Sequence, residues 1–173
     1  MGNKTLEEED KKIDLKSDPG RLIINLIAET SRGSAIVGIT YLEDLLSRYL
    51  KARLVDYNEG FKIIDHLNFE RKTILCYMFG MIDNETKSDL IILNKIRNKF
   101  AHNKDANNFN STIDKLNIPS TLDNLNIIKY LKDNKRSISP RIKYESVVNF
   151  YFGFLTEKIK DCKRIKSPKC FYK

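Results

Sequence analysis

The side chains in this sequence whose types and spacing best suit chemistry lie late in residues 90–102. This segment reads Leu-Ile-Ile-Leu-Asn-Lys-Ile-Arg-Asn-Lys-Phe-Ala-His, and its candidate catalytic residues are Arg97, Asn98 and His102. A histidine has an ordinary pKa of about 6.5 and can exchange a proton near neutral pH, while a guanidinium can stabilise developing negative charge. Asn98 could orient the anion or the imidazole. Together the three fit acid–base chemistry on an anionic substrate.

A helix must position these residues. At 3.6 residues per turn, most apolar residues of the segment share one broad sector, and Arg97 lies at its margin. Ile91, Asn98 and His102 project from nearly the opposite side, where a partner subunit is the simplest neighbour. In the alternative interpretation, Asn98 and His102 face solvent at a helix end, with Asn103 as the cap.

Arg97 also needs a partner of its own, because a guanidinium beside apolar residues requires an acid or another hydrogen-bonding group. Glu43 flanks the apolar sector of an earlier expected helix and is the candidate supporting residue. The alternative is that Glu43 is an ordinary carboxylate that reaches water from the margin of the core.

Two resemblances follow from these residues. The pattern from Arg97 to His102, an arginine, a polar residue and a histidine late in a helix, resembles the signature of the HEPN superfamily, whose better-known active members are metal-independent ribonucleases. Three blocks in order, at residues 32–46, 69–82 and 96–102, resemble the mannitol-operon repressor family over roughly residues 20–165. That second resemblance implies an all-α fold and a transcriptional regulator without a recognised DNA-binding motif.

The rest of the chain predicts a single all-α domain of about five or six helices. Residues 20–165 form this domain, between a flexible polar arm at 1–19 and a basic tail at 166–173. Ser34 is the expected cap of the second helix, and Ser139 the cap of a last helix that starts at Pro140. The expected helices cover 21–30, 34–55, a short element through 67, 69–81, the segment that ends at 102, 122–131 and the stretch after 140, with a long loop at 103–120.

Composition narrows the classes of protein. No apolar run approaches the ~20 residues of a membrane span, and the polar N-terminus does not resemble a signal peptide, so a cytoplasmic protein that does not bind membranes is expected. The three cysteines and the scattered glycines form no metal, disulfide or phosphate-loop pattern, so neither a metal nor a cofactor is expected. The net charge of +8 allows a phosphate-bearing partner such as RNA.

The last helix has more apolar surface than one core contact needs. Val147, Phe150 and Phe154 form a second apolar stripe beside its main one, which predicts a homodimer interface shared with Ile91. A two-fold axis there would double Arg97 and His102 in one groove.

Three functions remain open at the level of sequence. The leading hypothesis is a HEPN-like, metal-independent endoribonuclease, or a toxin derived from one, that acts in stress or phage defence. The first alternative is a regulator that acts through protein contacts, as the mannitol-repressor resemblance implies. The third is the antitoxin or immunity partner of a two-gene module.

Overall fold

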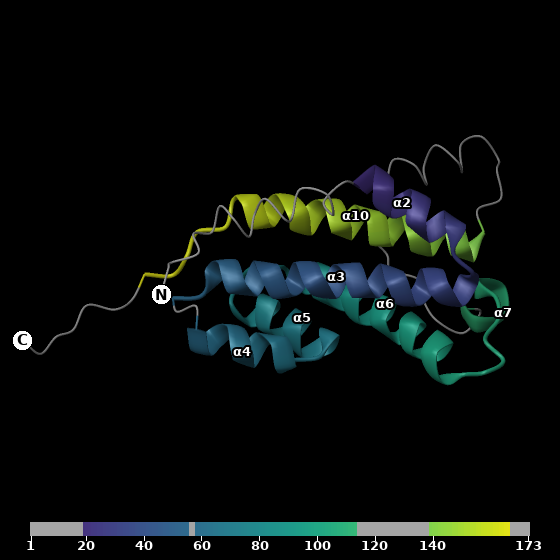
Figure 1. Cartoon of the computed structure of the whole chain (residues 1–173), viewed down its shortest axis with the longest axis horizontal. Helices are drawn as coiled ribbons and strands as arrows, with labels where there is room; N and C mark the ends of the chain where they lie inside the picture. Colours follow the sequence, from purple (N-terminus) through teal and green to yellow (C-terminus); the bar gives the residue numbers. More distant parts are fainter. Residues whose placement is uncertain (1–18, 56–57, 114–138, 167–173) are drawn as a thin grey trace, which may run out of the picture.

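The computed structural model describes residues 19–55, 58–113 and 139–166, and within these ranges all regular elements are helices (Figure 1). The all-α class expected from the sequence is therefore confirmed. The described helices are α2 (Pro19–Ala28), α3 (Ser31–Arg53), α4 (Asn58–His66), α5 (Phe69–Met78), α6 (Asn84–His102), α7 (Phe109–Ile113) and α10 (Pro140–Lys160). The expected helix at 122–131, residues 1–18 of the polar arm and the end of the basic tail lie outside the described residues.

Capping side chains fix where the helices start. The hydroxyl of Thr30 accepts a hydrogen bond from the Gly33 amide at 3.0 Å and caps α3. The expectation that Ser34 is this cap was therefore wrong. Ser34 lies inside the first turns of α3, where its hydroxyl donates to Glu145 Oε1 of α10 at 2.9 Å.

The other two caps follow the sequence more closely. Asp83 caps α6, accepting from the Thr86 amide at 2.7 Å. This bond to Thr86 is the main reason that the pKa of Asp83 lies below its ordinary value. Ser139 caps α10, and Pro140 occupies its first turn, as predicted.

The end of α5 differs from the prediction, because the helix stops at Met78 and does not reach Met81. Gly80 has a positive φ of 64°, which few residues other than glycine adopt. The Gly80 amide donates to the Tyr77 carbonyl and the Met81 amide to the Cys76 carbonyl. This pair of bonds forms a Schellman motif, which ends a helix sharply.

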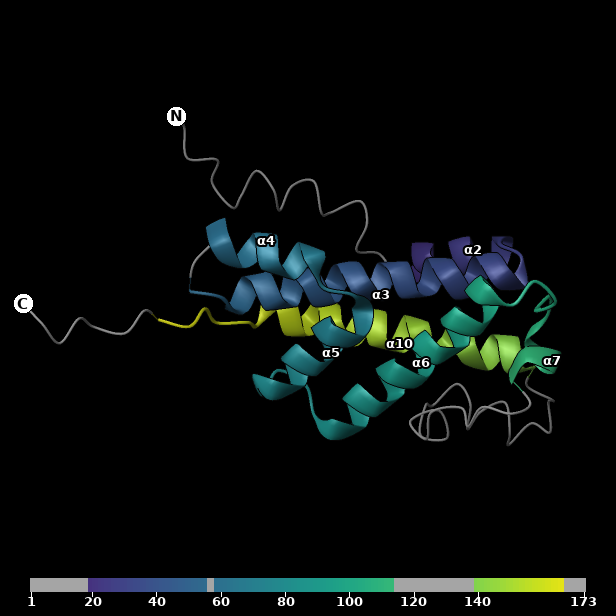
Figure 2. The same ribbon diagram turned by 90° about the horizontal axis from the view of Figure 1, so that it is seen from below.

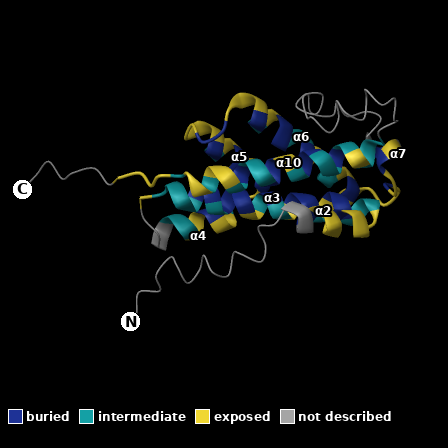
Figure 3. Ribbon diagram, turned by 90° about the horizontal axis from the view of Figure 1, so that it is seen from above, coloured by how far each residue is buried: buried dark blue, intermediate teal, exposed yellow. Residues whose placement is uncertain are grey.

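Helix α3 lies at the centre of the described bundle. It packs most extensively on α10, which runs parallel to it, and also contacts α2, α4, α5 and α6 (Figures 1 and 2). The buried faces of the helices meet around it (Figure 3). Gly38 brings α3 close to α10, since a Cβ atom there would lie 3.1 Å from Val148 Cγ1. None of the described helices is long and apolar enough to cross a membrane.

Candidate functional site

Arg97, Asn98 and His102 lie in the last turns of α6, as the sequence predicts. Arg97 Nη1 donates to the Asn98 side-chain Oδ1 at 2.9 Å, and both side chains are half-buried. His102 is exposed and is the last residue of the helix. Asn103 follows it as the C-cap, and its amide donates to the Lys99 carbonyl.

Glu43 does not pair with Arg97. Its Oε1 accepts a charged hydrogen bond from Lys72 Nζ of α5 at 3.0 Å. Lys72 is only 5% exposed, so the carboxylate compensates an ammonium that would otherwise be buried alone. The sequence held a signal that Lys72 needs a buried partner, because Lys72 shares the buried face of α5 with Phe69 and Cys76 at helical spacing.

Within the described residues, no acid forms an ion pair with Arg97. Its bonded partner, the Asn98 amide oxygen, is neutral. The positive charge of Arg97 acts electrostatically on the buried phenol of Tyr144 on α10. Burial raises the pKa of Tyr144 far above its ordinary value, and the nearby charge of Arg97 opposes that rise.

Contacts on two sides hold the end of α6. Arg32, at the start of α3, donates through Nη2 to the main-chain carbonyls of Asn103 at 2.9 Å and Lys104 at 3.1 Å. On the core side, the Phe109 ring of α7 packs between Phe100 and Tyr144, with centroid distances of 4.7 and 5.1 Å. The sequence pattern did not reveal this role of Arg32.

A buried carboxyl group anchors α6 two turns before Arg97. Tyr151 of α10 donates its hydroxyl to Asp89 Oδ2 at 2.6 Å, and Asp89 is 2% exposed. Burial raises the pKa of Asp89, while the hydrogen bond from Tyr151 opposes the rise. This contact fixes the register of α6 on α10 and therefore the position of the later turns that carry Arg97 and His102.

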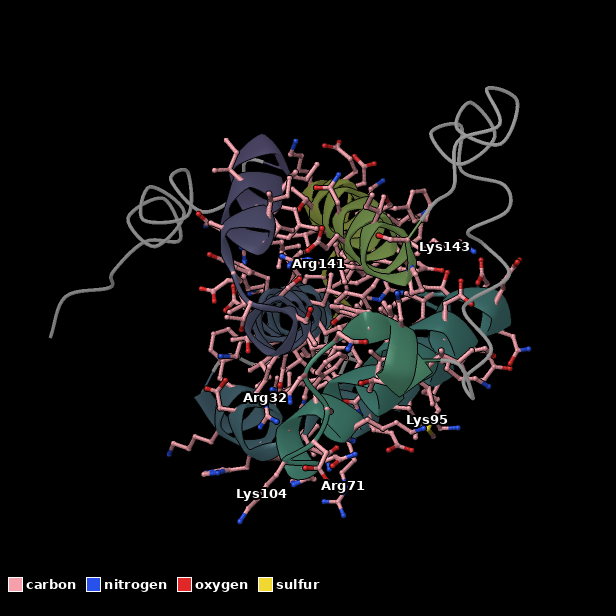
Figure 4. The ribbon with its side chains drawn as sticks, turned by 90° about the vertical axis from the view of Figure 1, so that its right-hand side faces the viewer. Arg32, Arg71, Lys95, Lys104, Arg141 and Lys143 are labelled. Atoms are coloured by element: carbon pink, nitrogen blue, oxygen red, sulfur yellow. The ribbon has the colours of Figure 1, made fainter. Side chains whose placement is uncertain are left out.

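Basic side chains surround this end of the bundle. Figure 4 looks onto it and shows Arg32, Lys104 and Lys95 on the side of α6, with Lys143 on α10. Lys95 and Lys104 are exposed. Asp105, in the same turn as Lys104, is exposed as well, and the four cations would attract a polyanion to this end of the bundle.

The residues predicted to form a dimer interface are only partly covered in the single chain. Ile91 and Phe154 are half-buried, and Phe150 is 37% exposed. The rings of Phe150 and Phe154 stack with centroids 6.3 Å apart. Val147 was wrongly placed on this surplus face, because it is fully buried in the core of the monomer.

No described pocket contains the three motif residues. A pocket of about 310 Å³ lies at the far end of α3, and another of about 410 Å³ lies over α3 and Phe152, but Arg97, Asn98 and His102 line neither. Among the described residues, no group of three or more His, Cys, Asp or Glu side chains could hold a metal ion. The candidate site is thus an open, basic surface at the end of α6.

No family model matches the chain, and no curated protein or solved structure matches it. The resemblances to the HEPN superfamily and to the mannitol-operon repressor family therefore stay predictions.

Proposed function

We propose that the protein is a HEPN-like, metal-independent endoribonuclease, or a toxin derived from one, that acts in stress or phage defence. One observation carries the proposal: the charge of Arg97 is held by the neutral Asn98 and matched by no described acid, and the exposed His102 lies about one turn further along α6. A guanidinium that no described acid neutralises keeps its charge available to an anion.

The proposed chemistry needs two groups. His102 takes the proton from a ribose 2′-hydroxyl, whose oxygen attacks the adjacent phosphorus while the bond to the 5′-oxygen breaks. Arg97 stabilises the negative charge that develops on the phosphorane, and Asn98 holds the guanidinium in place. The leaving 5′-oxygen takes up a proton, so the products are a 2′,3′-cyclic phosphate and a 5′-hydroxyl.

The proposal includes a homodimer. One arginine and one histidine on an open surface enclose no substrate, whereas two copies of α6 across a two-fold axis would form a groove with both residues doubled. Ile91, Phe150 and Phe154 supply the apolar surface for this contact. Light scattering at micromolar concentration tests it, and Ile91→Glu or Phe154→Glu should shift the protein toward monomer. A monomeric wild type would remove the shared groove.

The decisive test is cleavage of RNA by the purified full chain in EDTA. His102→Ala should lower the rate by about 10²-fold or more, the usual effect of losing a general base. His66→Ala is a matched control, because His66 is the other histidine of the chain and is also exposed at the last position of a helix, α4. Equal cleavage by the wild type and His102→Ala would end the ribonuclease assignment.

Arg97→Ala separates catalysis from stability. Because Glu43 pairs with Lys72, removing Arg97 strands no carboxylate among the described residues. We expect a loss of about 1 kcal/mol or less in the free energy of unfolding, the scale of one neutral hydrogen bond, together with a large loss of cleavage. A loss of ~3 kcal/mol or more with unchanged cleavage would assign Arg97 to structure.

One feature favours the second candidate function, a regulator that acts through protein contacts. Four apolar side chains near the end of α5 are exposed, namely Ile74, Tyr77, Met78 and Phe79. Such a cluster is typical of a surface that meets another protein, including the antitoxin or immunity pairing of the third hypothesis. Gene neighbours would separate these functions: sugar-transport genes favour regulation, and nucleotidyltransferase or phage-defence genes favour a toxin.

A further inference from the structure

The pocket of about 310 Å³ lies at the other end of the bundle from His102. Three chain segments line it: the end of α3, the turn that closes α5, and the end of α10 with the residues that follow. Arg32 and Arg53 mark the two ends of α3, which are about 30 Å apart at 1.5 Å of rise per residue. The pocket is therefore separate from the proposed ribonuclease site.

Positive charge converges on this pocket. Arg53, Lys158 and Lys163 line it, and Asp161, which is exposed, is the only carboxylate among its lining residues. Arg53 Nη1 donates to the main-chain carbonyl of Lys163 at 2.8 Å, which holds the guanidinium but does not neutralise it. Arg53 Nε is buried and has no hydrogen-bond partner in the described structure.

Lys158 forms no ion pair with any described acid. Its Nζ lies 5.4 Å from the centroid of the Phe154 ring. Its charge contributes weakly to the lowered pKa of Asp83, whose main interaction is the bond from the Thr86 amide. Positive charges that lie close together without paired acids repel one another, and a bound anion offsets this electrostatic repulsion.

Two aromatic side chains, Phe79 and Tyr49, also line the pocket and form an aromatic wall beside the cations. Phe79 is 47% exposed. The Tyr49 hydroxyl, on the opposite segment, already donates to the Met81 carbonyl at 3.0 Å, so Tyr49 offers the pocket mainly its ring. The Schellman motif at Gly80 sets this wall in place. A flat ring can stack on such a surface.

We propose that this pocket binds a small phosphate ester that carries a flat ring, of the class of the nucleoside monophosphates. Arg53, Lys158 and Lys163 bind the phosphate, which suits their donors and charge. The ring packs against Phe79. The volume of about 310 Å³ lies at the lower end of the range of ligand pockets, which is enough for one nucleotide.

The test is isothermal titration of the full chain with three probes: adenosine 5′-monophosphate, adenosine and inorganic phosphate. The monophosphate should bind at least ten-fold more tightly than either of the other two, because only it uses both the cations and the ring. Failure of the monophosphate to bind at millimolar concentration would overturn the proposal. Equal affinity for phosphate and monophosphate would also overturn it, because the ring would then contribute nothing.

Two lysines of α10 give a matched pair of variants. Lys158→Gln should weaken binding of the monophosphate about ten-fold, which corresponds to about 1.4 kcal/mol. Lys160→Gln removes the same charge from an exposed lysine that pairs with Glu157 and does not line the pocket, so it should leave affinity unchanged. Equal effects of the two substitutions would show that only the net charge attracts the anion and would refute the site.

Phe79→Leu tests the ring contact. The substitution should lower the affinity for the monophosphate and leave the weak affinity for inorganic phosphate unchanged. Circular dichroism of each variant checks that the protein is folded. An unchanged affinity for the monophosphate would contradict stacking on Phe79. None of these substitutions touches Arg97 or His102, so the outcome is independent of RNA cleavage.

Discussion

Tyr151→Phe should destabilise the protein in a way that depends on pH. The substitution removes the hydroxyl that donates to Asp89 at 2.6 Å and leaves the ring in the core. Asp89 is 2% exposed, so water does not readily replace the lost donor. A hydrogen bond to a charged group contributes about 1.5–3 kcal/mol, so we expect a loss of about 2 kcal/mol near pH 7.5, or roughly 4–8 °C in melting temperature for a domain of this size.

The sign of the pH dependence follows from the raised pKa of Asp89. The folded state binds the proton of the Asp89 carboxyl group more tightly than the unfolded state does. The stability that protonated Asp89 contributes is therefore fully present below the unfolded pKa of about 3.9, and it is lost as the pH rises through the folded pKa. Tyr151 opposes the shift, so its removal raises the pKa of Asp89 further. The cost of Tyr151→Phe should therefore fall as the pH is lowered from 7.5 toward 4.5, approaching the ~1 kcal/mol of a neutral hydrogen bond.

Urea unfolding followed by circular dichroism at several pH values measures this cost. Tyr144→Phe is the matched control, because it also deletes one buried hydroxyl from α10 but breaks a 2.8 Å bond to the neutral carbonyl of Ala35. Its cost should be about 1 kcal/mol and should not change between pH 4.5 and 7.5. If both substitutions cost the same at every pH, Asp89 is not a buried charge that Tyr151 stabilises, and the reasoning fails.

Three further predictions concern other contacts. Glu43→Gln should lower the free energy of unfolding more than Lys72→Met does. The Lys72 side chain is 7% exposed and that of Glu43 is 29% exposed, so only the glutamate can be hydrated by water once its partner is removed. Urea unfolding of both variants measures the difference, and the opposite order would contradict the prediction. Arg32→Ala should cost about 1–2 kcal/mol by removing two hydrogen bonds to carbonyls beyond α6, and hydrogen exchange should rise at the end of that helix and not in α5. Cys76 should react with iodoacetamide at pH 8 more slowly than Cys162 in the folded protein, because burial raises the pKa of the Cys76 thiol to about 12, whereas Cys162, whose pKa burial also raises, is only half-buried. Mass spectrometry of the peptides checks this, and equal labelling would refute it.

Local periodicity in the sequence predicted much of the helical structure. The apolar residues of α6 recur at helical spacing, and Leu93, Ile96 and Phe100 are buried as that spacing requires. Ser139 and Pro140 marked the start of α10 because a cap and a first-turn proline depend only on neighbouring residues. The end of α5 was missed although Gly80 was visible, because the apolar pattern continues past the glycine.

Pairing between helices was much harder to predict. Asp89 and Tyr151, or Glu43 and Lys72, are separated in sequence by 62 and 29 residues, and a single sequence does not say which helices are neighbours. The positions of Arg97 and His102 on α6 followed from periodicity, but the partner of Arg97 did not. Glu43 was chosen for its charge and its position beside the apolar sector of its helix, and the choice was wrong because the packing of α5 on α3 places Lys72 next to it.

The parallel packing of α3 on α10 also has a consequence for the order in which the chain can fold. Ser34 and Glu145, bonded across this interface, are 111 residues apart, so a ribosome must synthesise most of the chain before the two helices can meet. Until α10 emerges, the face of α3 around Gly38 has no partner from that helix, and such apolar faces are where chaperones bind and nascent chains aggregate. The loop closed by this contact is long, which predicts slow folding for an all-helical protein.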